Sequence, residues 1–380
     1  MPPETPDTDQ PATVQPALAP AKDVQDNIVV TRHTLTVGGQ TLHYTATAGT
    51  MVLRDEALKD GVSQGHPARA RVFFVAYALD SGAPTERPLT FSFNGGPGSS
   101  SVWLHLGLLG PQRVATDETG VAPPPPYALR DNEYTLLTHS DLVFIDPVGT
   151  GHSRMLENEA LTEFHEYQRD LDSVGEFIRL YLTRYNRWGS AKYLIGESYG
   201  TTRAAGLAHH LQEKHDIYLN GVMLVSLAID LQTLSFDHAN DLPYALFLPT
   251  YAATAWYHRA LGPDMQRKAL REVIAAAETF AHNEYNTALM QGSRLSPAER
   301  ERVASQVSRF TGLSIEYVLR CDLRPLDARF CKELLRQRGQ TVGRLDSRFV
   351  GQDRDDAGEQ PEADAAMNNL AGAYAACMNR

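Results

Sequence analysis

The stretch "LIGESYG", residues 194–200, decides the fold of this chain. It contains the pattern Gly-x-Ser-x-Gly with Ser198 at its centre, a strand-like run before it and a helix-like run after it. A sharp strand-to-helix turn crowds the neighbours of the central serine, so the flanking glycines avoid clashes and leave the serine oxygen exposed. The pattern therefore indicates a nucleophilic serine; the structural alternative is an ordinary serine in a glycine-flanked loop.

The segments on either side alternate between strand and helix patterns. The predicted strands are "ARVFFVAYAL", "PLTFSF", "DLVFI", "AKYLIG" and the buried strand "NGVMLVSLAI", and two earlier strands flank the hairpin turn at Gly38 and Gly39. Residues 160–187 carry apolar side chains at helical spacing, and a second helix is predicted after the serine. This alternation predicts a parallel sheet with helices on both faces.

The ends of the chain differ from this α/β segment, which we place at residues 28–240. Residues 1–27 are rich in Pro, Ala, Asp and Thr and lack the basic and apolar parts of a secretory signal, so we expect a disordered tail. By default this favours a cytoplasmic protein, and a periplasmic or secreted one if the true N-terminus differs. Residues 241–380 have helical patterns without a further buried strand, which predicts a helical cap or insertion, with one helix starting at Ser296-Pro297.

Composition argues against several classes of function. The formal net charge is −11 and no basic stripe is present, so we expect no nucleic-acid partner. The apolar run "GVMLVSLAI" is far too short to cross a membrane. The three cysteines have no zinc-binding spacing, although Cys321 and Cys331 could pair locally, and we expect neither a metal nor a cofactor.

A second glycine-rich stretch, "FNGGPGSSS" at residues 93–101, follows a predicted strand. Successive glycines allow backbone N–H groups to approach a ligand closely. An acyl-transfer enzyme needs two such donors directed at the developing oxyanion, one after the nucleophile and one from an earlier loop. Tyr199 and the Gly95-Gly96 loop fit these two places, while the alternative is a plain Gly/Pro turn.

Taken together, these motifs resemble those of the serine carboxypeptidase family, a branch of the α/β-hydrolases. "FNGGPGSSS" is similar to the family's Asn-Gly-Gly-Pro-Gly-Cys-Ser-Ser loop, and "YLIGESYG" to its Gly-Glu-Ser-Tyr-(Ala)-Gly turn. "DNEYTL" and "SDLVFIDPVGTGHS" are similar to its Asn-x-Tyr segment and its Asp-(Gln)-Pro-Val-Gly-x-Gly-Phe-Ser segment, and the likeness covers roughly residues 75–225. The sequence departs from the family at Ser99, which replaces a cysteine, before Pro147, where a glutamine is missing, and at His152, which replaces a phenylalanine.

The resemblance implies a fold, a reaction and a set of site residues. The fold is an α/β-hydrolase with a mostly parallel sheet, flanking helices and a helical insertion. Ser198 is the implied nucleophile, and the backbone N–H groups of Gly96 and Tyr199 form the oxyanion hole. Asn94, the Gly95 N–H and Glu197 bind the C-terminal carboxylate of a peptide substrate, whose last amino acid leaves as an acyl-enzyme forms. Because like charges repel, Glu197 must be protonated to donate a hydrogen bond to that carboxylate.

The base that should activate Ser198 is missing from the expected place. A serine nucleophile needs a base, normally a histidine that follows the acid in this superfamily. The histidines after the nucleophile lie on its own helix, after the next strand, or on helices of the cap: His209, His210, His215, His238, His258 and His282. His238, which follows Asp230, is the least unsuitable, yet no later core strand carries it.

The resemblance places the acid and base beyond the helical insertion. We therefore expect the 380 residues to be a truncated, poorly active part that lacks the last core strands and exposes an apolar sheet edge. A genuine short product without a triad is the alternative.

Two other classes of function remain open. One is an acyltransferase, esterase or hydroxynitrile lyase on the same scaffold, because a fold does not define a substrate. Asn94 and Glu197 favour peptide ends over these substrates. The other is a non-catalytic remnant, which the missing histidine favours and the intact turn at Ser198 opposes.

Overall fold

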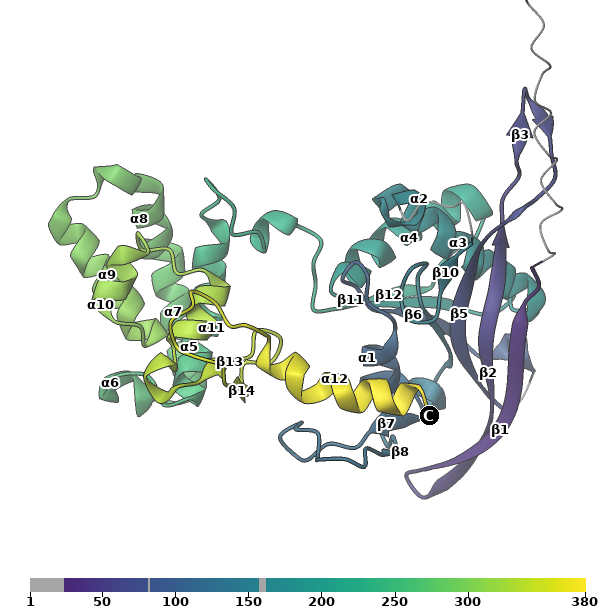
Figure 1. Ribbon diagram of the computed structural model, residues 1–380, viewed down its shortest axis with the longest axis horizontal. Helices are drawn as coiled ribbons and strands as arrows, with labels where there is room; N and C mark the ends of the chain where they lie inside the picture. The colour runs from purple at the N-terminus through teal and green to yellow at the C-terminus, as the bar shows by residue number, and fades with distance from the viewer. Residues whose placement is uncertain (1–23, 81–82, 157–161) are drawn as a thin grey trace, which may run out of the picture.

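The computed structural model describes residues 24–80, 83–156 and 162–380. Most of the predicted tail, 1–27, lies outside these residues, and the first strand begins at Asn27. Figure 1 shows a part built around a sheet and a separate group of helices, joined by an extended segment and by the last helix.

A sheet of eight strands organises the first part. Seven strands run in the order β1-β2-β5-β9-β6-β11-β12, and the short β10 pairs with β5. The bounds are β1 Asn27–Val37, β2 Gln40–Arg54, β5 Ala68–Leu79, β6 Leu89–Phe93, β9 Asp141–Ile145, β10 Arg154–Met155, β11 Lys192–Glu197 and β12 Gly221–Val225.

The sheet is mixed, with an antiparallel and a parallel half. β1, β2, β5 and β9 pair antiparallel, whereas β9, β6, β11 and β12 pair parallel. β1 and β2 are joined at Gly38 and Gly39, the turn expected from the sequence. Parallel neighbours need long crossover connections, and these contain the helices of the later half. The α/β-hydrolase fold predicted from the sequence is confirmed, with this mixed rather than mostly parallel sheet.

The two long helices of this part lie on the same face of the sheet. α3 (Tyr167–Arg184, preceded by the short α2, Thr162–His165) and α4 (Tyr199–His215) form one core with the strands, which includes Phe91, Phe177 and Leu207. The other face carries α1 (Val102–Leu104) and nearby turns, with Phe144 and Ile195 in a smaller core. The second face is thus covered by shorter elements than the sequence suggested.

β12 is an edge strand and not the buried strand that its apolar sequence predicts. Within the described residues it pairs only with β11, and Val222 and Leu224 are 36% and 40% exposed. An apolar run shows that a strand can be buried, but whether a neighbouring element covers it depends on the rest of the fold.

The segment from residue 242 onward is helical, as the sequence predicts. Helices α5 to α11 share a hydrophobic core of their own, which includes Tyr251, Tyr285 and Phe310. The predicted start at Ser296 is observed: its hydroxyl accepts the N–H of Glu299 at 3.3 Å, beside Pro297. The bounds are α5 Leu242–Tyr257, α6 Pro263–Gln266, α7 Leu270–Phe280, α8 Asn286–Gln291, α9 Pro297–Thr311, α10 Ile315–Arg320 and α11 Asp327–Glu333.

The last helix, α12 (Ala365–Met378), runs back from the helical group to the sheet part, where it ends near β7 and β8 (Figure 1). Tyr374 packs on Trp103 with ring centroids 4.5 Å apart. Short two-stranded ladders complete the structure, and none of the described helices is both long and apolar enough to cross a bilayer. The ladders are β3 Leu58–Lys59 with β4 Val62–Ser63, β7 Gln112–Val114 with β8 Leu129–Asp131, and β13 Thr341–Val342 with β14 Val350–Gly351.

Candidate active site

Ser198 occupies the sharp turn between β11 and α4. Its backbone has φ +57° and ψ −125°, a conformation that non-glycine residues rarely adopt. The turn is held on both sides, because the Ser198 N–H donates to the Val225 carbonyl at 3.0 Å and the Ser198 carbonyl accepts the Thr201 N–H at 2.8 Å. A side chain at Gly196 would overlap the Gly200 carbonyl, which explains why this position is glycine. The strand, turn and helix thus hold Ser198 at the carboxyl end of β11.

The glycine-rich loop after β6 lies directly against this turn. A side chain at Gly95 would overlap the backbone nitrogen of Tyr199, so only glycine permits the approach. Gly96, with φ +108°, follows on the exposed side of the loop. The structure therefore brings together the loop and the turn that carry the two predicted oxyanion donors, while their role remains a prediction.

Asn94 and Glu197, two of the predicted carboxylate-binding residues, are in direct contact. The Asn94 side-chain amide donates to Glu197 Oε2 at 2.9 Å, and its oxygen accepts the Leu104 N–H at 3.0 Å. Asn94 is completely buried and Glu197 is half-buried. A hydrogen bond across residues 103 positions apart in the chain couples the loop to the nucleophile turn.

A buried ion pair between Arg203 and Asp170, which was not predicted from the sequence, stabilises this junction. Arg203 on α4 donates to Asp170 on α3 at 2.8 Å and to the Asn94 carbonyl at 2.9 Å. The Tyr199 hydroxyl also donates to Asp170, at 3.3 Å, and burial together with this carboxylate raises the pKa of Tyr199 to about 12. The one sign of this ion pair in the sequence was the charged residue Asp170, which lies within the apolar face of a predicted helix.

The "DPVGTGHS" segment after β9 is fastened to the glycine loop through Asp146. Its carboxylate accepts the N–H groups of Ser101 at 2.8 Å and His152 at 3.3 Å. Burial, partly offset by these bonds, raises the pKa of Asp146. Beside this junction lies a cavity of about 420 Å³, lined on one side by Ser99 and on the other by Tyr374 of α12.

Comparison with known proteins agrees with this geometry. The family model for serine carboxypeptidases (Peptidase_S10) matches residues 59–307, more than half of the chain. The chain belongs to the serine carboxypeptidase family.

Individual members of the family are similar to only part of this chain. The pheromone-processing carboxypeptidase KEX1 of Yarrowia lipolytica is 31% identical over 165 residues, which are 43% of this chain and 25% of that protein. The serine carboxypeptidase-like 33 protein of Arabidopsis thaliana is 28% identical over 149 residues, which are 38% of this chain and 29% of that protein. The chain therefore spans only between a quarter and a third of the length of these two relatives.

Among solved structures, the prohormone-processing carboxypeptidase KEX1(delta)P of Saccharomyces cerevisiae aligns with 70% of this chain and 53% of its own, at 23% identity and a TM-score of 0.39.

In the part of this carboxypeptidase-family chain that the structure describes, none of the histidine side-chain hydrogen bonds involves Ser198. His210 is buried beside Asp172, and His258 bonds to the Ser347 carbonyl at 2.6 Å. His209, His238 and His282 are exposed, and His215 packs against His210. Within the described residues, no group of three or more His, Cys, Asp or Glu side chains could hold a metal ion. The described residues thus bring the glycine loop against the strained turn at Ser198.

Proposed function

We propose that this chain carries the nucleophile and the carboxylate-recognition part of a serine-type carboxypeptidase, which releases C-terminal amino acids from peptides. The observation that supports this most directly is the 2.9 Å hydrogen bond between Asn94 and Glu197, next to the strained turn at Ser198. An exopeptidase must recognise the free carboxylate at the end of a peptide, and Asn94 and Glu197 are placed to bind it. An esterase or acyltransferase does not need two carboxylate-binding side chains beside its nucleophile.

In the proposed reaction, Ser198 Oγ attacks the carbonyl carbon of the last peptide bond. The backbone N–H groups of Gly96 and Tyr199 stabilise the oxyanion. A general base takes the proton of Ser198 Oγ during the attack and gives it to the nitrogen of the leaving amino acid, and water then hydrolyses the acyl-enzyme. Asn94, the Gly95 N–H and protonated Glu197 hold the terminal carboxylate. Protonation of Glu197 removes the like-charge repulsion, so peptide binding should strengthen toward acid pH.

The test uses the protein isolated from its native source and N-blocked dipeptides with a free or an amidated C-terminus. We expect kcat/KM to be much higher for the free acid and to rise toward acid pH in the wild type. Glu197→Gln should flatten the acid part of this profile, because glutamine donates a hydrogen bond at every pH. Glu213→Gln, at an exposed site further along α4, is the matched control. An unchanged profile in Glu197→Gln, or equal turnover of acid and amide, would contradict the proposal.

A second candidate function is peptide binding without catalysis, which is favoured because no histidine hydrogen bond in the described residues involves Ser198. Removal of the base typically costs a serine hydrolase several orders of magnitude in rate. We therefore expect the 380-residue chain alone to have little or no peptidase activity. Rapid turnover of an N-blocked dipeptide by this chain, abolished by Ser198→Ala, would show that a base is present after all.

A further inference from the structure

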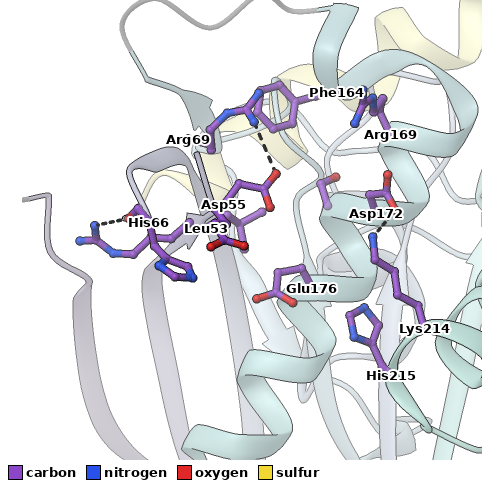
Figure 2. Close-up of a pocket in the computed structure, with 13 residues that line it drawn as sticks. Leu53, Asp55, His66, Arg69, Phe164, Arg169, Asp172, Glu176, Lys214 and His215 are labelled. Atoms are coloured by element: carbon purple, nitrogen blue, oxygen red, sulfur yellow. Dashed lines mark hydrogen bonds and ion pairs between the residues drawn. The ribbon is translucent and has the colours of Figure 1, made fainter. Parts of the chain in front are cut away.

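A cavity of about 510 Å³ lies beside the last turn of α4, the end of this helix opposite Ser198. Figure 2 shows the residues that line it. Its walls are the residues that end β2 and follow it, the start of β5, and the helices α3 and α4. Lys214 and His215 line it from the last turn of α4, and a helix of 17 residues places them about 25 Å from the nucleophile turn. Its volume falls within the range of pockets that bind small molecules. No step of the proposed reaction uses it.

The lining of this cavity carries equal numbers of both charges. The cationic side chains are Arg54, Arg69, Arg169 and Lys214. The carboxylates are Asp55, Glu56, Asp172 and Glu176. A small anion would be repelled by the four carboxylates, and a polyamine would be repelled by the four cations. An uncharged apolar ligand would remove water from most of these charged groups without pairing with them. A small ligand that carries both charges is the best match to this lining.

Most of these charges already have partners within the protein, and Arg54 donates to the carbonyls of His66 at 3.3 Å and Val24 at 2.7 Å. Asp55 pairs with Arg69 at 3.4 Å, and Figure 2 shows Lys214 bonded to Asp172, at 2.8 Å. Glu176 pairs with its helix neighbour Arg179 at 2.6 Å.

Glu56 and Arg169 have no ion-pair partner among the residues that the structure describes, and both side chains are exposed. They belong to different walls, since Glu56 follows β2 and Arg169 lies on α3. A ligand with an ammonium group and a carboxylate could therefore pair with both walls at once.

His215 adds a buried polar atom to the same cavity. Its Nε2 is inaccessible to solvent and has no hydrogen-bond partner in the described structure. Burial lowers the pKa of His215, partly offset by Glu176, so its imidazole is neutral at neutral pH. A neutral imidazole nitrogen can donate or accept one hydrogen bond, and a buried polar atom is rarely left without one.

We propose that this cavity binds a small zwitterion, a free amino acid or a short peptide, with its carboxylate at Arg169 and its ammonium group at Glu56. The proposal does not depend on the activity proposed for Ser198, because it rests on a different cavity and on different residues.

Isothermal titration calorimetry of the 380-residue chain with the dipeptide Gly-Leu at neutral pH tests this proposal. An exposed ion pair contributes up to about 1 kcal/mol, which corresponds to about fivefold in affinity. We expect N-acetyl-Gly-Leu and Gly-Leu amide each to bind about fivefold more weakly than Gly-Leu. Arg169→Gln should weaken the binding of Gly-Leu about fivefold and leave the affinity for Gly-Leu amide unchanged. Glu56→Gln should likewise weaken the binding of Gly-Leu about fivefold and leave the affinity for N-acetyl-Gly-Leu unchanged. A parallel titration with free leucine shows whether a single amino acid is enough for binding to the cavity.

Three controls locate the binding. Arg320→Gln and Glu316→Gln, on the exposed face of α10, should leave the affinity for Gly-Leu unchanged. Glu197→Gln should also leave it unchanged, because that residue belongs to the other site. Loss of binding in Glu197→Gln but not in Arg169→Gln would place the dipeptide at the proposed active site and overturn the proposal. Tighter binding of inorganic phosphate or putrescine than of Gly-Leu, or no binding of any zwitterion, would overturn it as well.

Discussion

At the scale of single residues, the conformation of Ser198 is the central feature. A positive φ in a residue with a side chain costs about 1–3 kcal/mol and persists only where the surroundings enforce it. Here the enforcing contacts are backbone hydrogen bonds to Val225 and Thr201, together with glycines that leave no room for side chains. The same contacts present the serine oxygen beyond the end of the sheet, so strain and exposure have a common cause.

Gly196→Ala should test this crowding. The new methyl group would overlap the Gly200 carbonyl, which is backbone and cannot move without distorting the turn. We expect a loss of about 2 kcal/mol or more in the free energy of unfolding, measured by urea denaturation. Gly189→Ala is the matched control, since its nearest neighbour would be Thr85 Cγ2 at 3.7 Å and its φ is not positive. Similar losses in the two variants would contradict the crowding argument.

His105 should make stability depend on pH. It is buried, bonded to the Tyr77 hydroxyl at 2.7 Å and stacked on Phe144, and burial lowers its pKa from 6.5 to about 3. As pH falls from 6.5 toward 3, the unfolded chain binds a proton that the native state cannot, so the free energy of unfolding decreases over this window. We expect His105 to account for about 2 kcal/mol of the loss between pH 7 and pH 4.5.

The measurement compares urea denaturation at these two pH values in the wild type and in His105→Gln. The variant should lose less stability on acidification than the wild type, whatever its stability at pH 7. His139→Gln, at an exposed position, should behave like the wild type. A variant with the same acid loss as the wild type would rule out His105 as the source.

At the scale of elements, the candidate site is a junction of helix α3, helix α4 and the glycine loop. Asp170 and Arg203 join the two helices, and Arg203 also holds the Asn94 carbonyl of the loop. The Arg203 guanidinium lies 5.2 Å from the ring centroids of both Phe93 and Tyr199. The position of the loop relative to the nucleophile therefore depends on the packing of two helices against each other.

Asp170→Asn should be strongly destabilising. It leaves the Arg203 guanidinium, 2% exposed, without its carboxylate, and loss of one partner of a buried pair costs about 3 kcal/mol or more. Asp172→Asn, two residues away on the same helix, breaks the more exposed pair with Lys214 and should cost at most about 1 kcal/mol. The double variant Asp170→Leu/Arg203→Met should lose less than the sum of its single changes. Equal costs for Asp170→Asn and Asp172→Asn would show that burial of the first pair is unimportant.

At the scale of the whole molecule, an apolar surface runs along the free edge of the sheet and into the connection toward the helical group. Leu224 on β12 is 40% exposed, and Leu227 and Ile229, just after it, are 58% and 48% exposed. An open strand edge with exposed apolar side chains favours pairing with another chain.

Leu224→Lys should therefore reduce self-association of the 380-residue chain, because a charge on an edge strand opposes pairing. Light scattering over a range of concentrations measures the effect, and the unfolding midpoint should change little since the side chain is already half exposed. Met290→Lys, at an 87% exposed position on α8, should leave the association unchanged. Equal effects of both substitutions would indicate a general effect of charge and not one of this edge.

The sequence predicted local features well and long-range ones poorly. The turn at Ser198 and the hairpin at Gly38 and Gly39 depend on neighbouring residues, so their patterns sufficed. Helix α12 lies within the segment predicted to be helical, but its return to the sheet part was not predicted, because Tyr374 and Trp103 meet across distant parts of the chain. The pair of Asp170 with Arg203 was missed because its members are 33 positions apart and neither lies in a motif.

The sequence by itself determined the nucleophile turn, the glycine loop and the family to which they point, because each is encoded in a few consecutive residues whose backbone requirements leave little choice. Only the tertiary structure decided that the Asn94 side chain donates to Glu197 and that Arg203 holds the Asn94 carbonyl. The exposed apolar sheet edge, by contrast, was expected from the sequence and is observed at β12. The tertiary structure also showed that the hydrogen bonds of the described histidine side chains go to partners other than Ser198. The physical reason is that contacts between distant segments depend on how the sheet and its helices pack, which no local pattern records.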